Sequence, residues 1–181
     1  MSEYISVDFV KPEQIIVDDL VLRPIPDTME YAKIIYDIFS DDIPGMLFWM
    51  GGYVYSSPED VLKVKFGFQY GIFRGDELLG QIVCSAMKSG RVEIGFWLKK
   101  SARGHGIISK VLPKVEKVIF DQDWCHKIIL QCNVNNLASK FVAIKNDYVL
   151  EGTMRQDEKW TDGSLHDVFY FGKLKSEWNK K

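Results

Sequence analysis

The alternation of apolar and polar positions along the chain predicts a series of short strands. Residues 14–24 form an extended segment that ends at Pro24, because proline cannot donate a hydrogen bond to a strand ladder. Period-two alternation over residues 71–84, interrupted by the turn residues Gly75 and Asp76, predicts a hairpin. Further strands are expected over residues 92–98, 127–132, 149–155 and 165–174.

Helices are predicted where the apolar spacing lengthens to three or four residues. Asp27 is the expected N-cap of a helix that runs to about Phe39, and Pro58 opens a second helix. Two later helices are expected. One follows a glycine-containing loop and ends at about residue 121, and the other covers about residues 136–145. The element order, ββαβ followed by αββ, predicts an α+β fold. Its mixed, mostly antiparallel sheet would contain one parallel crossover and be flanked by helices.

Composition narrows the class of protein without indicating a function. The 181 residues include 23 Lys+Arg and 25 Asp+Glu, so a net charge of −2 offers no general attraction to nucleic acid or an anionic membrane. Length and 46% hydrophobic content suit one domain over residues 1–181. The three cysteines form no Cys-x-x-Cys pair. With no secretory signal or long apolar run, a cytoplasmic protein without a structural metal site is expected.

The stretch after residues 92–98 carries the strongest chemical signal. Arg103, Gly104 and Gly106 stand directly before a predicted helix. Glycine lets backbone N–H groups approach an anion, and a helix N-terminus adds partial positive charge. The loop is therefore suited to a pyrophosphate, with Arg103 as a bidentate contact. A Gly-x-Gly pair alone is equally consistent with an ordinary helix-entry loop. The patterns of P-loop NTPases and of three-glycine dinucleotide loops are missing from the sequence.

These motifs, in this order, resemble the GCN5-related N-acetyltransferase (GNAT) family. Residues 101–106 occupy the family's acetyl-CoA loop, Gln/Arg-x-x-Gly-x-Gly/Ala, although Ser101 replaces its first residue. The strand 94–98 is similar to the "IGYWL" strand of the RimJ/RimL group, the ribosomal-protein N-terminal acetyltransferases. The likeness continues through residues 136–139, 145–152, 154–158, 162–163 and 166–168. It covers nearly the whole chain and implies the GNAT fold.

The resemblance implies acetyl-CoA as cosubstrate, bound between two strands, and no metal. In the family the strands corresponding to residues 93–98 and 127–132 splay apart, and pantetheine enters the gap like an added strand. Gly95 would mark either a bulge that opens the sheet or a packing contact. The residues expected to bind the cosubstrate are Phe96, Trp97, Leu98, Arg103, Gly104, His105, Gly106, Ile107 and Asn136.

Two catalytic residues follow from the same resemblance. Many relatives use a tyrosine as general acid on the helix that corresponds to residues 136–145, but this segment contains none. The RimL-like arrangement has a serine there, which Ser139 matches, and a glutamate base, which Glu158 matches. Read without the family, Ser139 is a hydroxyl that satisfies a helix N–H group, and Glu158 is an exposed hairpin charge.

The predicted function is acetyl-CoA-dependent acetyl transfer to a primary amine, and the likeness to RimL favours a protein or peptide N-terminus. The alternatives are a small amine, such as a polyamine, an amino-acid-like metabolite or an aminated antibiotic, and a non-catalytic acyl-CoA-binding module. Acidic residues near the last hairpin would favour a cationic acceptor. The resemblance implies that the aromatic residues Phe48 and Trp49 line its cleft, whereas read without the family they are core residues. Relatives are often dimers, so a homodimer is a possible assembly.

Overall fold

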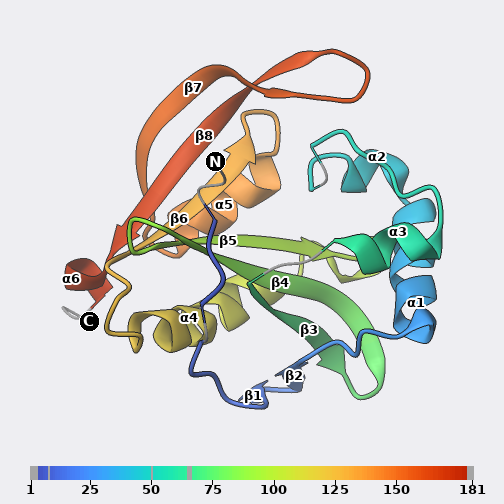
Figure 1. The fold of residues 1–181 in the computed structure, drawn as a ribbon, viewed down its shortest axis with the longest axis horizontal. Coiled ribbons are helices and arrows are strands. Elements are labelled where there is room, and N and C mark those ends of the chain that lie inside the picture. The colour runs from blue at the N-terminus through green and yellow to red at the C-terminus, as the bar shows by residue number, and fades with distance from the viewer. Residues whose placement is uncertain (1–3, 8, 50, 65–66, 179–181) are drawn as a thin grey trace.

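The computed structural model describes residues 4–7, 9–49, 51–64 and 67–178, which form one eight-stranded sheet with helices packed against it (Figure 1). The strands are β1 (Ile15–Val17), β2 (Leu20–Arg23), β3 (Phe68–Arg74), β4 (Glu77–Met87), β5 (Arg91–Leu98), β6 (Lys127–Asn133), β7 (Val149–Lys159) and β8 (Leu165–Leu174). Their order in the sheet is β1-β2-β3-β4-β5-β6-β8-β7. Only the β5–β6 pair is parallel among these strands, which confirms the predicted mixed sheet.

Helices cover both faces of this sheet. They are α1 (Met29–Ser40), α2 (Ile43–Met46), α3 (Pro58–Lys63), α4 (Ile107–Phe120), α5 (Leu137–Lys145) and α6 (Lys175–Trp178). Alternate strand residues point to opposite faces, so Ile72 packs with α4 while its neighbour Phe73 packs with α1. The α4 face holds the larger of two hydrophobic clusters, and α1 and α2 cover the smaller one.

The two parts of the sheet, β1 to β5 and β6 to β7, are joined by a very short ladder. β5 pairs with β6 only from Arg91–Lys127 to Glu93–Ile129. Beyond these residues β5 continues to pair with β4, and β6 continues to pair with β8, so the two strands separate. This is the splayed parallel pair that the GNAT fold was expected to have. The β7–β8 hairpin follows β6 and projects beyond the rest of the sheet (Figure 1).

A buried ion pair fixes β8 to α4. Lys173 Nζ lies 2.7 Å from Glu116 Oε1, and both side chains are almost completely buried. The same ammonium stands 4.4 Å from the ring centroid of Tyr148, so it also makes a cation–π contact. Removal of either partner would leave an uncompensated buried charge and would strongly destabilise the protein.

Several local predictions need correction. The N-cap of α1 is Thr28, whose side chain accepts from Tyr31 N, and not Asp27. The chain between α1 and α3 contains the short helix α2, which sequence patterning did not predict. β7 continues to Lys159 instead of ending at about residue 155. Gly95 lies in regular register opposite Val83, so it does not mark a bulge there.

Candidate active site

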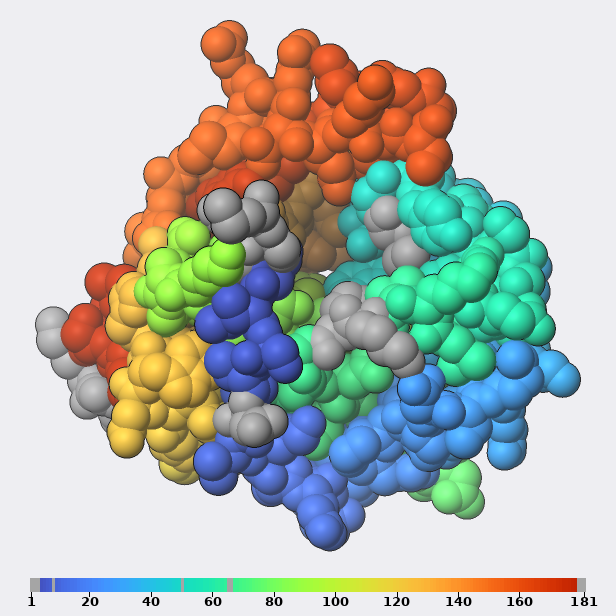
Figure 2. All heavy atoms as spheres, viewed as in Figure 1, coloured from blue at the N-terminus to red at the C-terminus, as the bar shows by residue number. Residues whose placement is uncertain are grey.

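A cavity of about 840 Å³ opens where β5 and β6 separate. Its walls come from α2 and the residues that follow it, from β5, from the start of α4, from β6 and α5, and from the β7–β8 hairpin. Figure 2 shows the molecule hollowed between the orange hairpin and the cyan segment around α2. The cavity therefore joins segments from both parts of the sheet.

At one end lies the loop of residues 99–106, called here the cofactor loop. Gly104 has φ +80° and Gly106 has φ +70°, a conformation that L side chains rarely adopt. Gly106 is the N-cap of α4, and its carbonyl accepts the first helical bond from Lys110 N at 3.1 Å. Among the described residues no atom lies within 4 Å of where a Cβ would stand at either glycine. The backbone of the loop is thus open to an incoming anion.

Most of the predicted cosubstrate residues line this one cavity. They are Phe96, Trp97, Leu98, Gly104, Gly106, Ile107 and Asn136, together with Arg103. His105 is the exception, because it is exposed on the loop and is not part of the cavity lining. The position of His105 gives no support to its predicted cosubstrate contact.

Arg103 lines the cavity, but its guanidinium is already engaged within the protein. Nη1 lies 2.5 Å from Asp42 Oδ2, and Nε donates to the Leu98 carbonyl at 2.9 Å. Nη2 contacts Met46 Sδ at 3.6 Å. These contacts use three of the five guanidinium N–H donors, and the predicted pyrophosphate contact of Arg103 stays a prediction.

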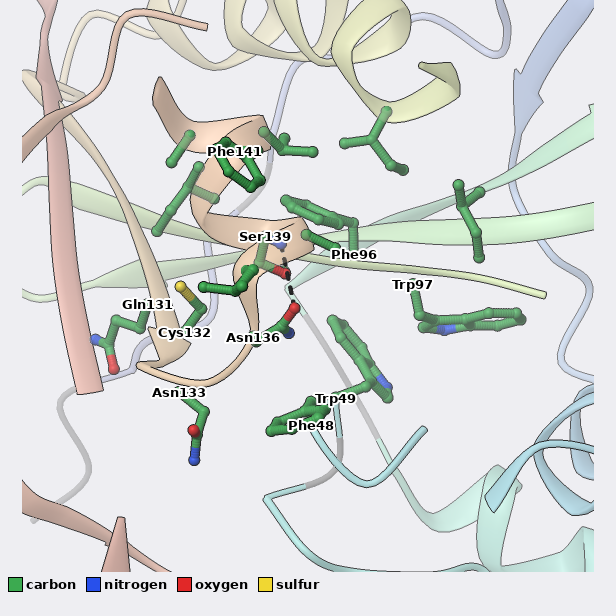
Figure 3. A pocket seen from close by; sticks show the side chains of 18 of the residues that line it. Phe48, Trp49, Phe96, Trp97, Gln131, Cys132, Asn133, Asn136, Ser139 and Phe141 are labelled. Atoms are coloured by element: carbon green, nitrogen blue, oxygen red, sulfur yellow. Dashed lines mark hydrogen bonds between the residues drawn. The ribbon is translucent and has the colours of Figure 1, made fainter. Parts of the chain in front are cut away.

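The N-terminus of α5 points into the cavity opposite Phe48 and Trp49 (Figure 3). Asn136 is the N-cap of this helix, and its Oδ1 accepts from Ser139 N at 3.2 Å. The side chain of Ser139 lines the cavity, as does Cys132 of β6. Burial raises the pKa of Cys132 to about 11, so this thiol stays protonated at neutral pH.

Glu158 reaches the cavity from the far end of β7. The register with β8 jumps between Met154 and Glu158, and Gln156 has φ +55° within this bulge. The bulge brings both Asp157 and Glu158 into the cavity lining. Trp160 Nε1 donates to Glu158 Oε2 at 2.9 Å, which fixes the carboxylate.

An aromatic segment faces Glu158 across the cavity. We call residues 43–49, 51 and 52 the acceptor wall. A Cβ on Gly51 would lie 2.8 Å from Glu158 Oε1, and one on Gly52 would lie 2.5 Å from Trp160 Cβ. Phe48 and Trp160 pack edge to face at 5.6 Å. The hairpin and the acceptor wall therefore touch, which makes this end of the cavity narrow.

Gly95 is explained by the same wall. A Cβ at this position would lie 2.7 Å from Cζ3 of Trp49, so only glycine lets the indole lie on β5. Of the two interpretations of Gly95, the structure supports the packing contact. The indole thus forms part of the cavity directly beyond the point where β5 and β6 separate.

Sequence reasoning missed one of the three carboxylates in the cavity lining. Glu93 shares a face of β5 with Gly95 and Trp97, and it is the last β5 residue that pairs with β6. Burial raises the pKa of Glu93, an effect opposed by a hydrogen bond from the Tyr4 hydroxyl. The alternation of the strand shows which residues share a face, but only the strand separation makes that face part of a cavity.

A buried amide on β6 was also missed. Asn133 Oδ1 accepts from Asn135 N at 3.0 Å, which fixes the orientation of the amide. Asn133 is 3% exposed, and its Nδ2 has no hydrogen-bond partner among the described residues. Nothing in the local sequence distinguishes this asparagine from the next two, Asn135 and Asn136.

Two other features of the described residues bear on the chemistry. No group of three or more His, Cys, Asp or Glu side chains could hold a metal ion in the part of the chain that the structure describes. Within those same residues no helix is both long enough and apolar enough to span a membrane.

Comparisons with curated proteins point to one family of enzymes. Residues 19–149 match the family model of the acetyltransferase (GNAT) domain. The ribosomal-protein-serine acetyltransferase of Escherichia coli is 34% identical over 105 residues, which are 57% of this chain and 58% of that protein. The chain thus spans about three fifths of the length of the curated relatives it matches.

Solved structures agree with this match. A RimL ribosomal L7/L12 α-N-protein acetyltransferase in complex with coenzyme A is 25% identical and superposes with a TM-score of 0.74, over 90% of this chain and 98% of that one. An acetyltransferase of Salmonella typhimurium that modifies the N-terminal serine of ribosomal protein L7/L12 has the same identity and TM-score, over 86% and 94% of the two chains. The family match and these superpositions agree with the splayed sheet: the chain belongs to the GNAT acetyltransferase family.

Proposed function

We propose that this protein is an acetyl-CoA-dependent N-acetyltransferase that acts on the α-amine of a protein or peptide N-terminus. One observation carries the proposal. The separation of β5 from β6 places the cofactor loop, an open strand edge and three carboxylates around a single cavity. A donor and an acceptor could meet there without further rearrangement of the sheet.

The residues of the cavity fit acetyl-CoA. The backbone of the cofactor loop and the N-terminus of α4 suit its pyrophosphate, and the β5 edge at residues 96–98 suits the amides of its pantetheine arm. Bound there, acetyl-CoA supplies a thioester carbonyl that an amine can attack. The cavity volume of about 840 Å³ leaves room for the arm and a second reactant.

The chain's own residues would then move two protons. Glu158 accepts a proton from the acceptor ammonium, so that the neutral amine can form the new C–N bond. A backbone N–H group near Trp97 or Leu98 stabilises the negative charge on the carbonyl oxygen. As the C–S bond breaks, the Ser139 hydroxyl gives its proton to the departing thiolate and takes up the proton that the newly bonded nitrogen loses, which leaves a neutral amide and a thiol. Glu93 lies on the face of β5 that lines the cavity, and it provides a further negative charge there for a cationic acceptor.

A peptide N-terminus is favoured over a small amine by two lines of support. The relatives reported above are named for acetylation of ribosomal proteins, one of them at an N-terminal serine. The contact between the acceptor wall and the hairpin also leaves a narrow approach, which suits an extended chain end.

The test is release of thiol from acetyl-CoA in the presence of a panel of acceptors. The panel contains peptides with free N-termini, the same peptides with blocked N-termini, and polyamines and amino sugars. Turnover only with free peptide N-termini is the expected result. Turnover with small amines alone would assign the small-amine reaction instead, and tight CoA binding without any turnover would mean a binding module.

A further inference from the structure

The ion pair between Arg103 and Asp42 joins two walls of the cavity. Arg103 belongs to the cofactor loop, whereas Asp42 stands directly before α2, 61 residues away in the sequence. The Asp42 side chain is only 12% exposed, and that of Arg103 is 35% exposed. A pair this sheltered, with a second bond from Arg103 to the Leu98 carbonyl, is held more firmly than a typical surface pair.

Two local features show that α2 is built around this pair. Asp42 is the N-cap of α2, yet its side chain makes no capping hydrogen bond, because its carboxylate is turned to Arg103. Gly45 leaves the space that the pair occupies, since a Cβ there would overlap both Arg103 Nη1 and Asp42 Oδ2. α2 has only four residues, so its position depends on such outside contacts.

The acceptor wall begins with α2, and local hydrogen bonds connect this helix to the rest of the wall. Leu47 N donates to Ile43 O at 3.0 Å, and Trp49 N donates to Met46 O at 3.0 Å. Gly52 N then donates to Leu47 O at 2.9 Å. These local bonds connect Asp42 to the aromatic residues that face Glu158. A displacement of α2 would therefore move the acceptor side of the cavity.

We propose that Arg103 is a positioning residue, which couples the cofactor loop to the acceptor wall through Asp42. Acetyl-CoA bound at the loop would hold Arg103, α2 and the wall in place for the acceptor. Because coupling between two ligands is reciprocal, a bound acceptor peptide would tighten coenzyme A binding by the same factor. The inference rests on the proposed function, since it needs an acceptor on this wall.

The coupling is tested with Asp42→Asn, Arg103→Lys and Arg103→Ala. Direct coenzyme A affinity is measured by calorimetry, and acceptor-peptide KM is measured at saturating acetyl-CoA. We expect peptide KM to rise about fivefold or more in each variant, with coenzyme A affinity changed less than about twofold. The Asp42→Asn/Arg103→Ala double variant should be no worse than the poorer single variant, because both remove one interaction.

Arg74→Ala is the matched control, since it breaks an exposed Arg–Asp pair with Asp19 far from the cavity lining. Arg74→Ala should leave both the coenzyme A affinity and the acceptor-peptide KM unchanged. A loss of coenzyme A affinity by tenfold or more in the Arg103 variants, with peptide KM unchanged, would overturn the inference and make Arg103 a cosubstrate contact. Circular dichroism identifies a variant that fails to fold, and Asp42→Asn then tests the pair alone.

Hydrogen exchange gives a readout that does not require turnover. Coenzyme A should slow exchange of amides at residues 43–49 in the wild type and not in Asp42→Asn. Equal protection in both proteins would contradict the coupling. A wild type that binds coenzyme A, shows this protection, and yet acetylates no amine would contradict only the proposed function.

Discussion

Glu158 illustrates how a single backbone irregularity places the side chain of the proposed base. Within a regular strand, Asp157 and Glu158 would point to opposite faces. The bulge around Gln156 brings both into the cavity lining, and the Trp160 indole fixes the second of them. The family resemblance identified Glu158, whereas the bulge that positions it has no recognisable signal in the sequence.

Replacement of Glu158 by Gln should lower kcat by about 10²–10⁴-fold, because the amide cannot accept the proton of the ammonium. Coenzyme A affinity should not change. Steady-state kinetics and calorimetry check the two expectations. Glu151→Gln is the control, since Glu151 lies on the same strand but pairs with Lys127 outside the cavity lining. Unaltered turnover in Glu158→Gln would remove this residue from the mechanism.

Glu93 should leave a signature in the dependence of stability on pH. Its pKa is raised in the folded protein above the ordinary value of 4.5, mainly by burial. The stability that it contributes is therefore fully present below pH 4.5 and is lost as pH rises through the folded-state pKa. Relative to Glu93→Gln, the wild type should lose unfolding free energy as pH rises above 4.5 in urea titrations. Parallel curves for the two proteins would contradict this.

At the scale of elements, those set by local sequence patterns could be predicted, and those set by contacts between distant residues could not. The β3–β4 hairpin and the start of α4 follow from turn residues and glycines that lie within them, and both were predicted. α2 was not, because a four-residue helix that contains Pro44 and Gly45 has weak local preference for helix. Its position depends on Arg103, and no local pattern could indicate that contact.

The cofactor loop allows a direct test of the cosubstrate site. Gly104→Val would force a β-branched residue into φ +80°, at a cost of about 1–2 kcal/mol if the loop keeps its shape. Coenzyme A affinity should fall roughly tenfold, as measured by calorimetry. Gly75→Val, at φ +58° in the β3–β4 turn, imposes similar strain away from the cavity and should not change affinity. Undiminished affinity in Gly104→Val would show that the assignment of this loop is wrong.

At the scale of the whole molecule, the cavity lies between two parts of the sheet that share only a short ladder. A ligand that bridges them should stabilise both against unfolding. At a coenzyme A concentration of 100 times its Kd, the expected gain is about 2.7 kcal/mol, or roughly 5–10 °C in Tm. Thermal denaturation with and without coenzyme A measures this shift. Adenosine is the control and should give a much smaller change, because it lacks the pyrophosphate and the pantetheine arm.

The order of the last strands has a consequence for the newly made protein. β8 lies between β6 and β7, although β7 precedes it in the chain. β7 therefore cannot join the sheet until β8 has been synthesised and has paired with β6. Glu158 is on β7, so the proposed base reaches the cavity only after β8 has been synthesised and has joined the sheet. A nascent chain could bind its cosubstrate before it could use it, and activity would begin only when this last pairing is made.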